Sequence, residues 1–513
     1  MRRTIILTLL TIAVSASMQV TSAIAAAGSI RIVDSSVEPL TLHPHRSFDP
    51  DSDVIISQIY EGLVDYDCDG KLEPKLAVRW ERKSPTRYRF WLREGVTFHD
   101  GEPFDANAVL FSVTHQFQRG SPAANSWLFD SHIQAKVVDR YTVDLFTGQP
   151  DFRFPYILPM FLKILPPRYF REVGDEGLAS RPVGTGPYRF VRWIRGHCIQ
   201  LEANRSYWRK GLPRIKEVTF LFLPQPQQVA ALLDGRVDLV TKLRGNDILR
   251  VMAVQNAKVL KRPVATVFWV AMKNFDSPFA DRRVRQAMNY AVNKEHLIQY
   301  AERGNASRVA TMTNPIELDY DPNLRPYPFD PAKACRLLAE AGFPHGFTVR
   351  ALASEETGDM IRAIQAQLRM VGVTLQLTIV PREDYLRQTI ISKIRTGKPK
   401  FDGDMVVWLT PNPTLHAFFS PAVIFCSKSP YSIMHSARFD ELYFSAVREL
   451  EPVQRRNKLF RLQSLMLSEA YGIYTSQRVQ TYGLRRGLHL TIHPSGMLVG
   501  DVLAAAYLGN DLN

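Results

Sequence analysis

Histidines and acids in two short segments are the first side chains that could do chemistry. His43-Pro44-His45 places two imidazoles two residues apart, a spacing that could ligate a metal ion. Nothing nearby in the sequence completes such a site, so we predict no metal and no cofactor. His99-Asp100 pairs a base with an acid, but a glycine follows and Asp-Gly is typical of a turn, which is the interpretation we favour.

The signature motifs of enzymes are missing from the sequence. There is no HExxH, no Gly-x-Ser-x-Gly and no phosphate-binding loop. Residues 181–190, RPVGTGPYRF, contain a Gly-x-Gly, but Pro187 follows at once and there is no third glycine or Lys-Ser/Thr pair. We therefore predict that the protein is not an enzyme, with a secreted enzyme working in a cleft as the alternative.

The N-terminus has the pattern of an export signal. Two arginines come early, an apolar run extends from about Ile5 to Val14, and small residues surround Ala25. This order predicts a cleavable signal peptide over residues 1–25. No cysteine follows the cleavage region before Cys68, so we expect a free periplasmic protein and not a lipoprotein.

Length, composition and charge limit the remaining classes. A chain of 513 residues predicts two or three lobes, and 45% hydrophobic with 22% charged residues is typical of a globular protein. The formal net charge is +14, but the arginines are spread along the chain and form no basic tract. We expect no nucleic-acid partner, and a preference for anionic or neutral ligands. Four cysteines allow disulfides, whose pairing the sequence does not decide.

The stretch 72–104, LEPKLAVRWERKSPTRYRFWLREGVTFHDGEPF, is the most specific pattern in the chain. Tyr88, Phe90 and Leu92 alternate with polar residues, which predicts a half-buried strand. Turn residues follow, and Asp105 stands where the cap of a helix over 106–118 should lie.

The rest of the chain predicts an α/β protein in which strands and helices alternate. Strands are predicted over 29–35, 133–138, 142–146, 218–223, 237–240, 267–274, 347–352, 373–380 and 401–408. Helices are predicted over 54–63, 106–118, 277–298, 329–343, 360–371, 438–450 and 453–467. Prolines between 150 and 167 are expected to break any regular structure.

Several of these segments together resemble one family. The corner LREGVTFHDGEPF, the turn RPVGTGPYRF and the segment NRSYWRKGLPRIKEVTFLFLPQPQQVAALLDGRVDLV are similar to family 5 of the bacterial extracellular solute-binding proteins. These are peptide- and nickel-type periplasmic receptors of ABC importers. The resemblance implies a monomer that delivers a small ligand to inner-membrane permease subunits by hinged closure.

The resemblance also implies a fold. It is the two-lobed periplasmic binding protein fold (type II, class C-like), with an extra subdomain inserted in the first lobe. Lobe I would comprise 28–270 and about 485–513, with the insertion at about 65–195, and lobe II would comprise 271–484. Hinges are expected near Lys273–Asn274 and Tyr482–Leu484.

Ligand-binding residues follow from the same resemblance. In the family, a strand ending in tryptophan leads into the cleft and the next loop touches the ligand. Here these residues are Trp408, Thr410, Pro411 and Asn412. Trp127 would form the opposite wall, and the loop with His43 and His45 would border the cleft.

The loop after Trp408 departs from the family's commonest pattern. Peptide-binding members commonly place an aspartate three residues after that tryptophan, where it pairs with the free amine of the peptide. Here Pro411 takes the position, and no acid occurs between Asp404 and Asp440. Because a buried ammonium needs a carboxylate partner, we hypothesise a ligand whose main anchor is not a free amine. Peptide-like and opine- or sugar-like anions stay open, with a nickel- or metallophore-type chelate as the alternative.

Overall fold

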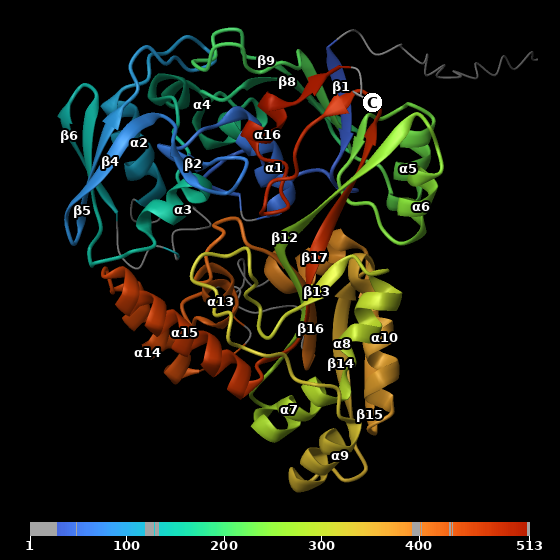
Figure 1. Ribbon diagram of the computed structural model, residues 1–513. Coiled ribbons are helices and arrows are strands. Elements are labelled where there is room, and N and C mark those ends of the chain that lie inside the picture. Colours follow the sequence, from blue (N-terminus) through green and yellow to red (C-terminus); the bar gives the residue numbers. More distant parts are fainter. Residues whose placement is uncertain are drawn as a thin grey trace, which may run out of the picture.

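The computed structural model describes residues 28–47, 49–117, 128, 133–391, 401, 403–429, 432, 434 and 436–509. They form two α/β lobes, one above the other in Figure 1, and two long strands run between them. This is the architecture that the sequence predicted. The four cysteines all lie in the described part of the chain and all are free thiols.

One sheet of eleven strands extends through both lobes. Its strands are β1 (Ser29–Val33), β8 (Tyr188–Ile194), β9 (Cys198–Ala203), β10 (Glu217–Leu221), β11 (Leu239–Val240), β12 (Ala257–Met272), β13 (Ala306–Arg308), β14 (Phe347–Ser354), β15 (Val373–Val380), β16 (Met405–Pro411) and β17 (Gly472–Arg485). The order is β15-β14-β16-β12-β17-β11-β1-β10-β9-β8, and β13 pairs with β17 outside this path. Strands β12 and β17 are the two that cross between the lobes (Figure 1).

The part of the sheet that lies in lobe I is mixed, with parallel pairing around β1 and antiparallel pairing of β8, β9 and β10. β1 pairs in parallel with β10 on one side and with β11 on the other. The helices of this lobe include α1 (Pro50–Ile59), α5 (Gln225–Leu233), α6 (Asn246–Met252) and α16 (Gly500–Ala505). Gly184 and Gly186 of the predicted turn pack so closely on Ile59 that an added Cβ would overlap its carbonyl group. The amide of Gly186 donates to Ile59 O at 2.8 Å, so this turn fixes α1 to the start of β8.

The region predicted as an insertion has a small sheet of its own. Its strands are β4 (Ala77–Ser84), β5 (Arg87–Leu92), β6 (Gln134–Asp139) and β7 (Thr142–Phe146), in the order β4-β5-β7-β6. Tyr88, Phe90 and Leu92 are buried as the alternation predicted. The helix α2 (Ala106–Phe117) follows Asp105, whose Oδ1 accepts from the Asn107 amide at 2.8 Å. β8 pairs with β9 in the large sheet, although the predicted limits of the insertion include it.

The prediction that prolines break all regular structure between 150 and 167 is wrong. Pro155 lies in the first turn of α3 (Phe154–Phe161), and Pro167 begins α4 (Pro167–Ser180). A first-turn proline removes only an amide that would have no helical partner, so it is compatible with a helix. Pro159 is tolerated inside α3 because that helix has only 8 residues.

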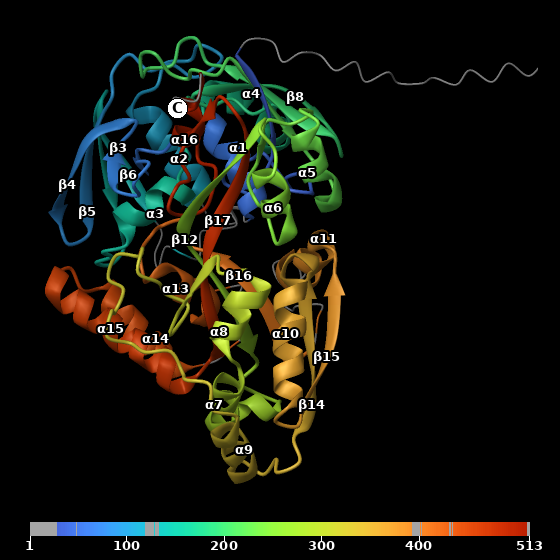
Figure 2. The same cartoon turned by 45° about the vertical axis from the view of Figure 1, so that its right-hand side comes forward.

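Lobe II repeats the alternation of strands and helices. β14 pairs in parallel with β15 and with β16, and α10 (Gly358–Arg369) connects β14 to β15. Asp281 caps α7 (Arg282–Ala291) and Asp330 caps α9 (Pro331–Glu340), as predicted. The lobe also contains α11 (Arg382–Leu386), α13 (Phe419–Phe425), α14 (Ala437–Val447) and α15 (Pro452–Glu469). Figure 2 shows α11 at the end of lobe II that faces lobe I.

The two crossing strands are irregular where they pass between the lobes. The antiparallel register of β12 on β17 shifts between Pro263 and Val267. Before this shift, β12 pairs with residues 479–485 of β17, and after it with residues 472–477. Beyond the shift β12 also pairs with β16 of lobe II. The change from lobe I pairing to lobe II pairing therefore coincides with an interrupted ladder.

Candidate ligand-binding cleft

Charged side chains follow parallel strands of both lobes, at the point where each strand ends. In lobe I, Asp34 follows β1 and Lys242 follows β11, and these two strands are neighbours that pair at Val33 and Val240. In lobe II, Glu356 follows β14 and Arg382 follows β15, which pair at Ser354 and Val380. The carboxyl ends of parallel strands are the usual place of ligand sites in α/β sheets.

These side chains meet in a network between the lobes, which we call the cleft ion network. Its members are Asp34, Asp51, Lys242, Arg244, Glu356, Arg382 and Arg478. Arg382 of lobe II donates from Nε to Asp51 of α1 at 2.9 Å and from Nη1 to Glu356 at 3.0 Å. Arg244 of lobe I donates to Glu356 of lobe II. Lys242 Nζ lies 3.2 Å from Asp34 and 3.6 Å from Asp51.

Charge pairing favours the ionised forms of Glu356 and Asp51 despite their burial. Burial raises the pKa of Glu356, but Arg244, Arg382 and other nearby cations outweigh it and hold the pKa far below its usual range. For Asp51, burial again raises the pKa, and Arg382 and Lys242 bring it below the ordinary value. The same carboxylates raise the pKa of Arg382 against the effect of its burial.

The network carries an excess of positive charge. Four cations, Lys242, Arg244, Arg382 and Arg478, contact three carboxylates, Asp34, Asp51 and Glu356. The side chains of Lys242 and Arg382 are still 28% and 25% exposed. They border a polar hollow of about 520 Å³ together with Ser35, Gln225 and Asp247. The same hollow is also lined by Asp34, Glu355 and Glu356, so its wall offers cations to an anionic group but carries negative charge as well.

An apolar cavity of about 170 Å³ lies beside the network, and Glu356 and Arg382 belong to its lining. Both lobes line it. Lobe I contributes Pro50, Asp53, Leu128, Met160, Phe161 and Met497. The lining residues of lobe II include Ser354, Glu356, Arg382, Tyr385, Trp408, Thr410, Pro411, Phe419 and Val423. Phe161 of α3 stacks on Phe419 of α13 with ring centroids 5.8 Å apart, so the lobes also touch through apolar side chains. The size is close to that of a cavity that holds one benzene ring.

Trp408 forms an aromatic wall of this cavity. Its ring meets the edge of Tyr385 at a centroid distance of 5.7 Å, and the Tyr385 hydroxyl donates to Val407 O at 2.6 Å. Among the described residues, the buried Nε1 of Trp408 has no hydrogen-bond partner. A buried indole N–H without an acceptor is costly, so an acceptor on a bound ligand would stabilise the site. Thr410 is held in place by Trp269, whose Nε1 donates to Thr410 Oγ1 at 2.9 Å.

Asp53 is the acid of the cavity that the cleft ion network does not include. It lies on α1 and accepts a hydrogen bond of 2.5 Å from Ser47. Burial raises its pKa to about 7. Asp53 therefore keeps its proton to a higher pH than an ordinary aspartate, and a nearby cation on a ligand would favour its charged form.

The structure divides the site residues proposed from the sequence. Trp408, Thr410 and Pro411 line the cavity. Asn412 is buried inside its own loop, where Nδ2 donates to His416 O at 2.9 Å and Oδ1 accepts from Thr414. Trp127 lies outside the described residues.

His43 and His45 are placed away from the cavity walls. Both are buried, in a cluster with His115 and Asp175. Within this cluster the ligand atoms of His43, His115 and Asp175 lie close enough to hold a metal ion. From this part of the chain it is α1, which follows the loop, that contributes Pro50 and Asp53 to the cavity lining.

Glu356, Arg382 and Tyr385 are the cleft residues that sequence reasoning missed. The sequence did contain a signal for two of them, because β14 and β15 were predicted and these residues follow directly after their ends. Glu356 is the second residue after Ser354, where β14 ends, and Arg382 is the second residue after Val380, where β15 ends. Lys242 and Arg244 could be found in the same way after β11.

A comparison with models of protein families agrees with the family resemblance seen in the sequence motifs and with the two-lobed fold. The model of the bacterial extracellular solute-binding proteins, family 5, matches residues 71–424, which is more than half of the chain. The chain belongs to this family. The resemblance seen in the sequence motifs is thereby confirmed.

Proteins that are similar to this chain in sequence or in structure support the same family assignment. The glutathione-binding protein GsiB of Pectobacterium atrosepticum is 33% identical over 356 residues, which span 66% of this chain and 66% of that relative. The solved structure of DppA from Helicobacter pylori with the peptide STSA has a TM-score of 0.82 at 23% identity, covering 94% of this chain and 98% of the other. AgaA from A. tumefaciens R10 with agropinic acid gives a TM-score of 0.81 at 24% identity, covering 94% and 99%.

These relatives are periplasmic or extracellular binding proteins, and family members bind small ligands or peptides and work with ABC permeases. Within the described residues, no helix has the length and apolar character required to cross a membrane.

Proposed function

We propose that this protein is a periplasmic solute receptor that presents a small ligand to an ABC import permease. The observation that carries the proposal is the cavity whose walls come from both lobes and whose rim is formed by ion pairs between them. A ligand in this place contacts both walls only when the lobes are together. Binding therefore shifts the population toward the closed form that the permease receives.

The ligand is a small organic acid with an apolar part. The cations of the cleft ion network hold its anionic group, and the cavity beside Trp408 and Tyr385 takes the apolar part. A free amine is not its main anchor, since the loop after Trp408 is free of acids and Glu356 is already paired with arginines. Glutathione, in the name of the 33% identical relative, is likewise a small organic acid.

The binding cycle follows from the crossing strands. We place the hinge at the register shift between Pro263 and Val267, some residues before the segment near Lys273–Asn274 favoured by sequence. The ladder is already interrupted there, so rotation breaks few hydrogen bonds. The receptor acts as a monomer, is exported through a signal peptide over residues 1–25, performs no catalysis and binds no nucleic acid.

Mass spectrometry of the ligand that co-purifies from the periplasm tests this function. We expect a small organic acid, released on unfolding at one molecule per chain. A thermal-shift panel of matched acids, each with its amine free or acetylated, then tests the anchor, because a ligand that binds only the native state raises the melting temperature. Equal shifts from both forms support an anionic anchor. Recovery of ordinary di- to oligopeptides, with loss of the shift on acetylation, would contradict it.

A further inference from the structure

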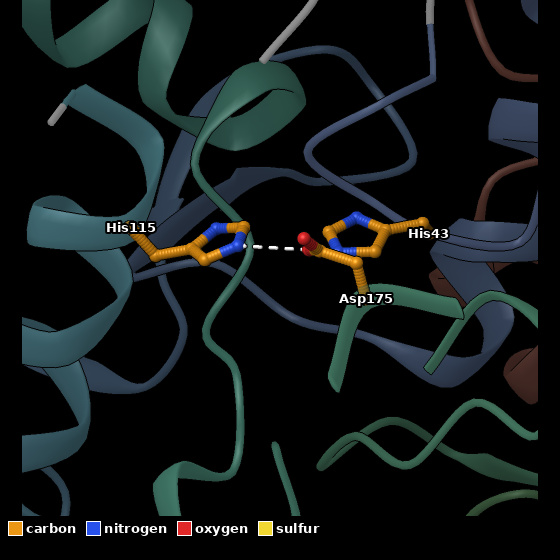
Figure 3. Close-up of side chains that lie close together, drawn as sticks. All are labelled: His43, His115 and Asp175. Atoms are coloured by element: carbon orange, nitrogen blue, oxygen red, sulfur yellow. Dashed lines mark hydrogen bonds and ion pairs between the residues drawn. The ribbon is translucent and has the colours of Figure 1, made fainter. Parts of the chain in front are cut away.

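Three side chains from separate segments meet in lobe I, outside the cleft. His43 lies in the loop before α1, His115 on α2 and Asp175 on α4 (Figure 3). Nε2 of His43 is 2.8 Å from Asp175 Oδ1, and Nε2 of His115 is 3.0 Å from the same oxygen. Both imidazoles are buried, whereas the side chain of Asp175 is 28% exposed. A cation could therefore reach the group past Asp175.

A second row of contacts fixes the proton positions of this histidine cluster. The carbonyl oxygen of Lys163 accepts from His45 Nε2 at 2.8 Å, so Nε2 of His45 carries the proton. Its Nδ1 is then an acceptor, and the proton of the 2.9 Å contact between the two Nδ1 atoms belongs to His115.

This assignment leaves a lone pair facing a lone pair. A neutral His115 protonated on Nδ1 has a bare Nε2, and that atom points at a carboxylate oxygen 3.0 Å away. Two acceptors at this distance repel each other unless a positive charge lies between them. The geometry thus requires a cation at this position, either a proton or a metal ion.

We propose that His43, His115 and Asp175 form a binding site for a divalent transition-metal ion of the zinc type. Two imidazole nitrogens and one carboxylate oxygen are a ligand set that zinc accepts, with a fourth position open to water. The contacts from His115 through His45 to Lys163 resemble the outer-shell hydrogen bonds that orient metal-binding histidines.

Metal binding requires small rearrangements. With bonds of about 2.0–2.1 Å, ligand atoms in a tetrahedral site lie roughly 3.3 Å apart, so Asp175 must withdraw by a few tenths of an ångström. Arg46 contacts the other carboxylate oxygen, Oδ2, at 2.8 Å and leaves Oδ1 for the ion. His43 accepts from the His45 amide through Nδ1 at 3.2 Å, and this long hydrogen bond is lost when Nε2 binds metal, because Nδ1 then carries the proton.

Sequence reasoning reached only the first half of this site. His43-Pro44-His45 was considered as a metal pair without a completing ligand, and the prediction was no metal. The completing side chains are distant in sequence, and the second histidine of the pair orients His115 through a hydrogen bond. Only the packing of α2 and α4 brings them together.

Isothermal titration of tag-free, metal-stripped full-length mature protein with ZnCl₂ tests the proposal. Cys335 is exposed and is changed to serine in all samples, so that its thiol cannot bind zinc. We expect one ion per chain, and a Co²⁺ spectrum with nitrogen and oxygen ligands only. The variants Asp175→Asn and His115→Gln should lose at least the roughly 10–100-fold in affinity that even outer-shell changes cause. His345→Gln, at an exposed histidine, should bind as the parent does.

Failure of the parent protein to bind Zn²⁺ would overturn the proposal, because the cation would then be a proton. Unchanged affinity in both folded site variants would also overturn it. Neither result depends on the proposed transport function, since the three ligands lie outside the cavity lining and ligand binding in the cleft is measured separately.

Discussion

Two groups of buried opposite charges show how similar chemistry has different consequences in this molecule. The cleft ion network joins lobe I to lobe II through Asp51, Arg382, Glu356 and Arg244. A second group, the lobe I ion cluster, consists of Glu73, Lys75, Arg209 and Asp501 and lies within one lobe. The pairs Arg382–Asp51 and Arg244–Glu356 of the first group exist only while the lobes are together. Pairs of the second group exist in every folded conformation.

The side chains of the two groups also differ in their exposure to solvent. Lys75 has a side chain that is 2% exposed, and it donates to Asp501 of α16, close to the C-terminus. Arg382 is 25% exposed and faces a hollow that a ligand can enter. We therefore expect the lobe I ion cluster to determine stability and the cleft ion network to determine binding.

Lys75→Met should have the largest effect. It removes the central cation of the lobe I ion cluster and leaves Asp501 with Arg209 as its remaining partner at 3.0 Å. Breaking a buried pair in this way costs about 3–5 kcal/mol in free energy of unfolding. Urea unfolding should show this loss, while titration at a temperature where the variant is folded should show unchanged ligand affinity. The matched control is Lys71→Met, at an exposed lysine. A large loss of affinity in folded Lys75→Met would remove the distinction between the two groups.

Arg382→Gln should act mainly on binding. The change leaves Asp51 and Glu356 without their shared cation, but opening of the cleft lets water solvate them. We expect ligand affinity to fall by roughly 10–100-fold, equivalent to about 1.4–2.8 kcal/mol, and small-angle scattering to show a larger radius of gyration. Arg387→Gln, in the segment that follows α11 and 54% exposed, is the matched control. If Arg382→Gln lowered stability and left affinity intact, the network would be a structural feature only.

Much of the scaffold could be predicted because each element carries its own local signal. Asp281 and Asp330 are helix caps, and the alternation of Tyr88, Phe90 and Leu92 predicts one buried face. Strand β17 was not predicted as an element, although it is one of the two connections between the lobes. Its 14 residues are buried on both faces for most of their length, so the alternation typical of a half-buried strand is absent.

The candidate site was less predictable because it depends on contacts between distant segments. Trp408, Thr410 and Pro411 were reached through the family pattern. Asp51, Glu356 and Arg382 come from two lobes, and no local spacing indicates that they meet. The rule that ligand sites form at the carboxyl ends of parallel strands would have found Glu356 and Arg382, had it been applied to the predicted strands.

Trp408→Ala tests the apolar half of the cleft. It removes the wall that packs on Tyr385 and the buried N–H that has no partner among the described residues. We expect affinity to fall roughly tenfold, since an aromatic contact contributes about 0.5–1.5 kcal/mol beyond its buried area. Trp408→Phe keeps most of the surface and removes the N–H, so its loss should be smaller and should show the contribution of the hydrogen bond. Unaltered affinity in Trp408→Ala would exclude this residue from the binding wall.

Asp53→Asn should give an effect that depends on pH. Burial raises the folded-state pKa of Asp53 to about 7, above the ordinary value of 3.8. Between these two values the native protein binds more protons at this site than the unfolded chain, so stability falls as pH rises. The asparagine cannot ionise and avoids this loss. The difference in unfolding free energy between variant and parent should therefore grow from about pH 4 to about pH 7 in favour of the variant, by at most about 1.4 kcal/mol per pH unit.

Urea unfolding at pH 4.5, 6 and 7.5 measures this difference, with Asp69→Asn at an exposed acid as control. Asp53 and Glu356 are two acids of the same cavity whose pKa values are shifted in opposite directions. Glu356 is equally part of the cavity lining, but its arginine partners hold its pKa far below the usual range, so it does not titrate in this interval. A difference that stayed constant with pH would show that Asp53 is ionised throughout. Asp53 would then be available as a permanent partner for an amine, and the acids with acetylated amines would bind more weakly than their free forms.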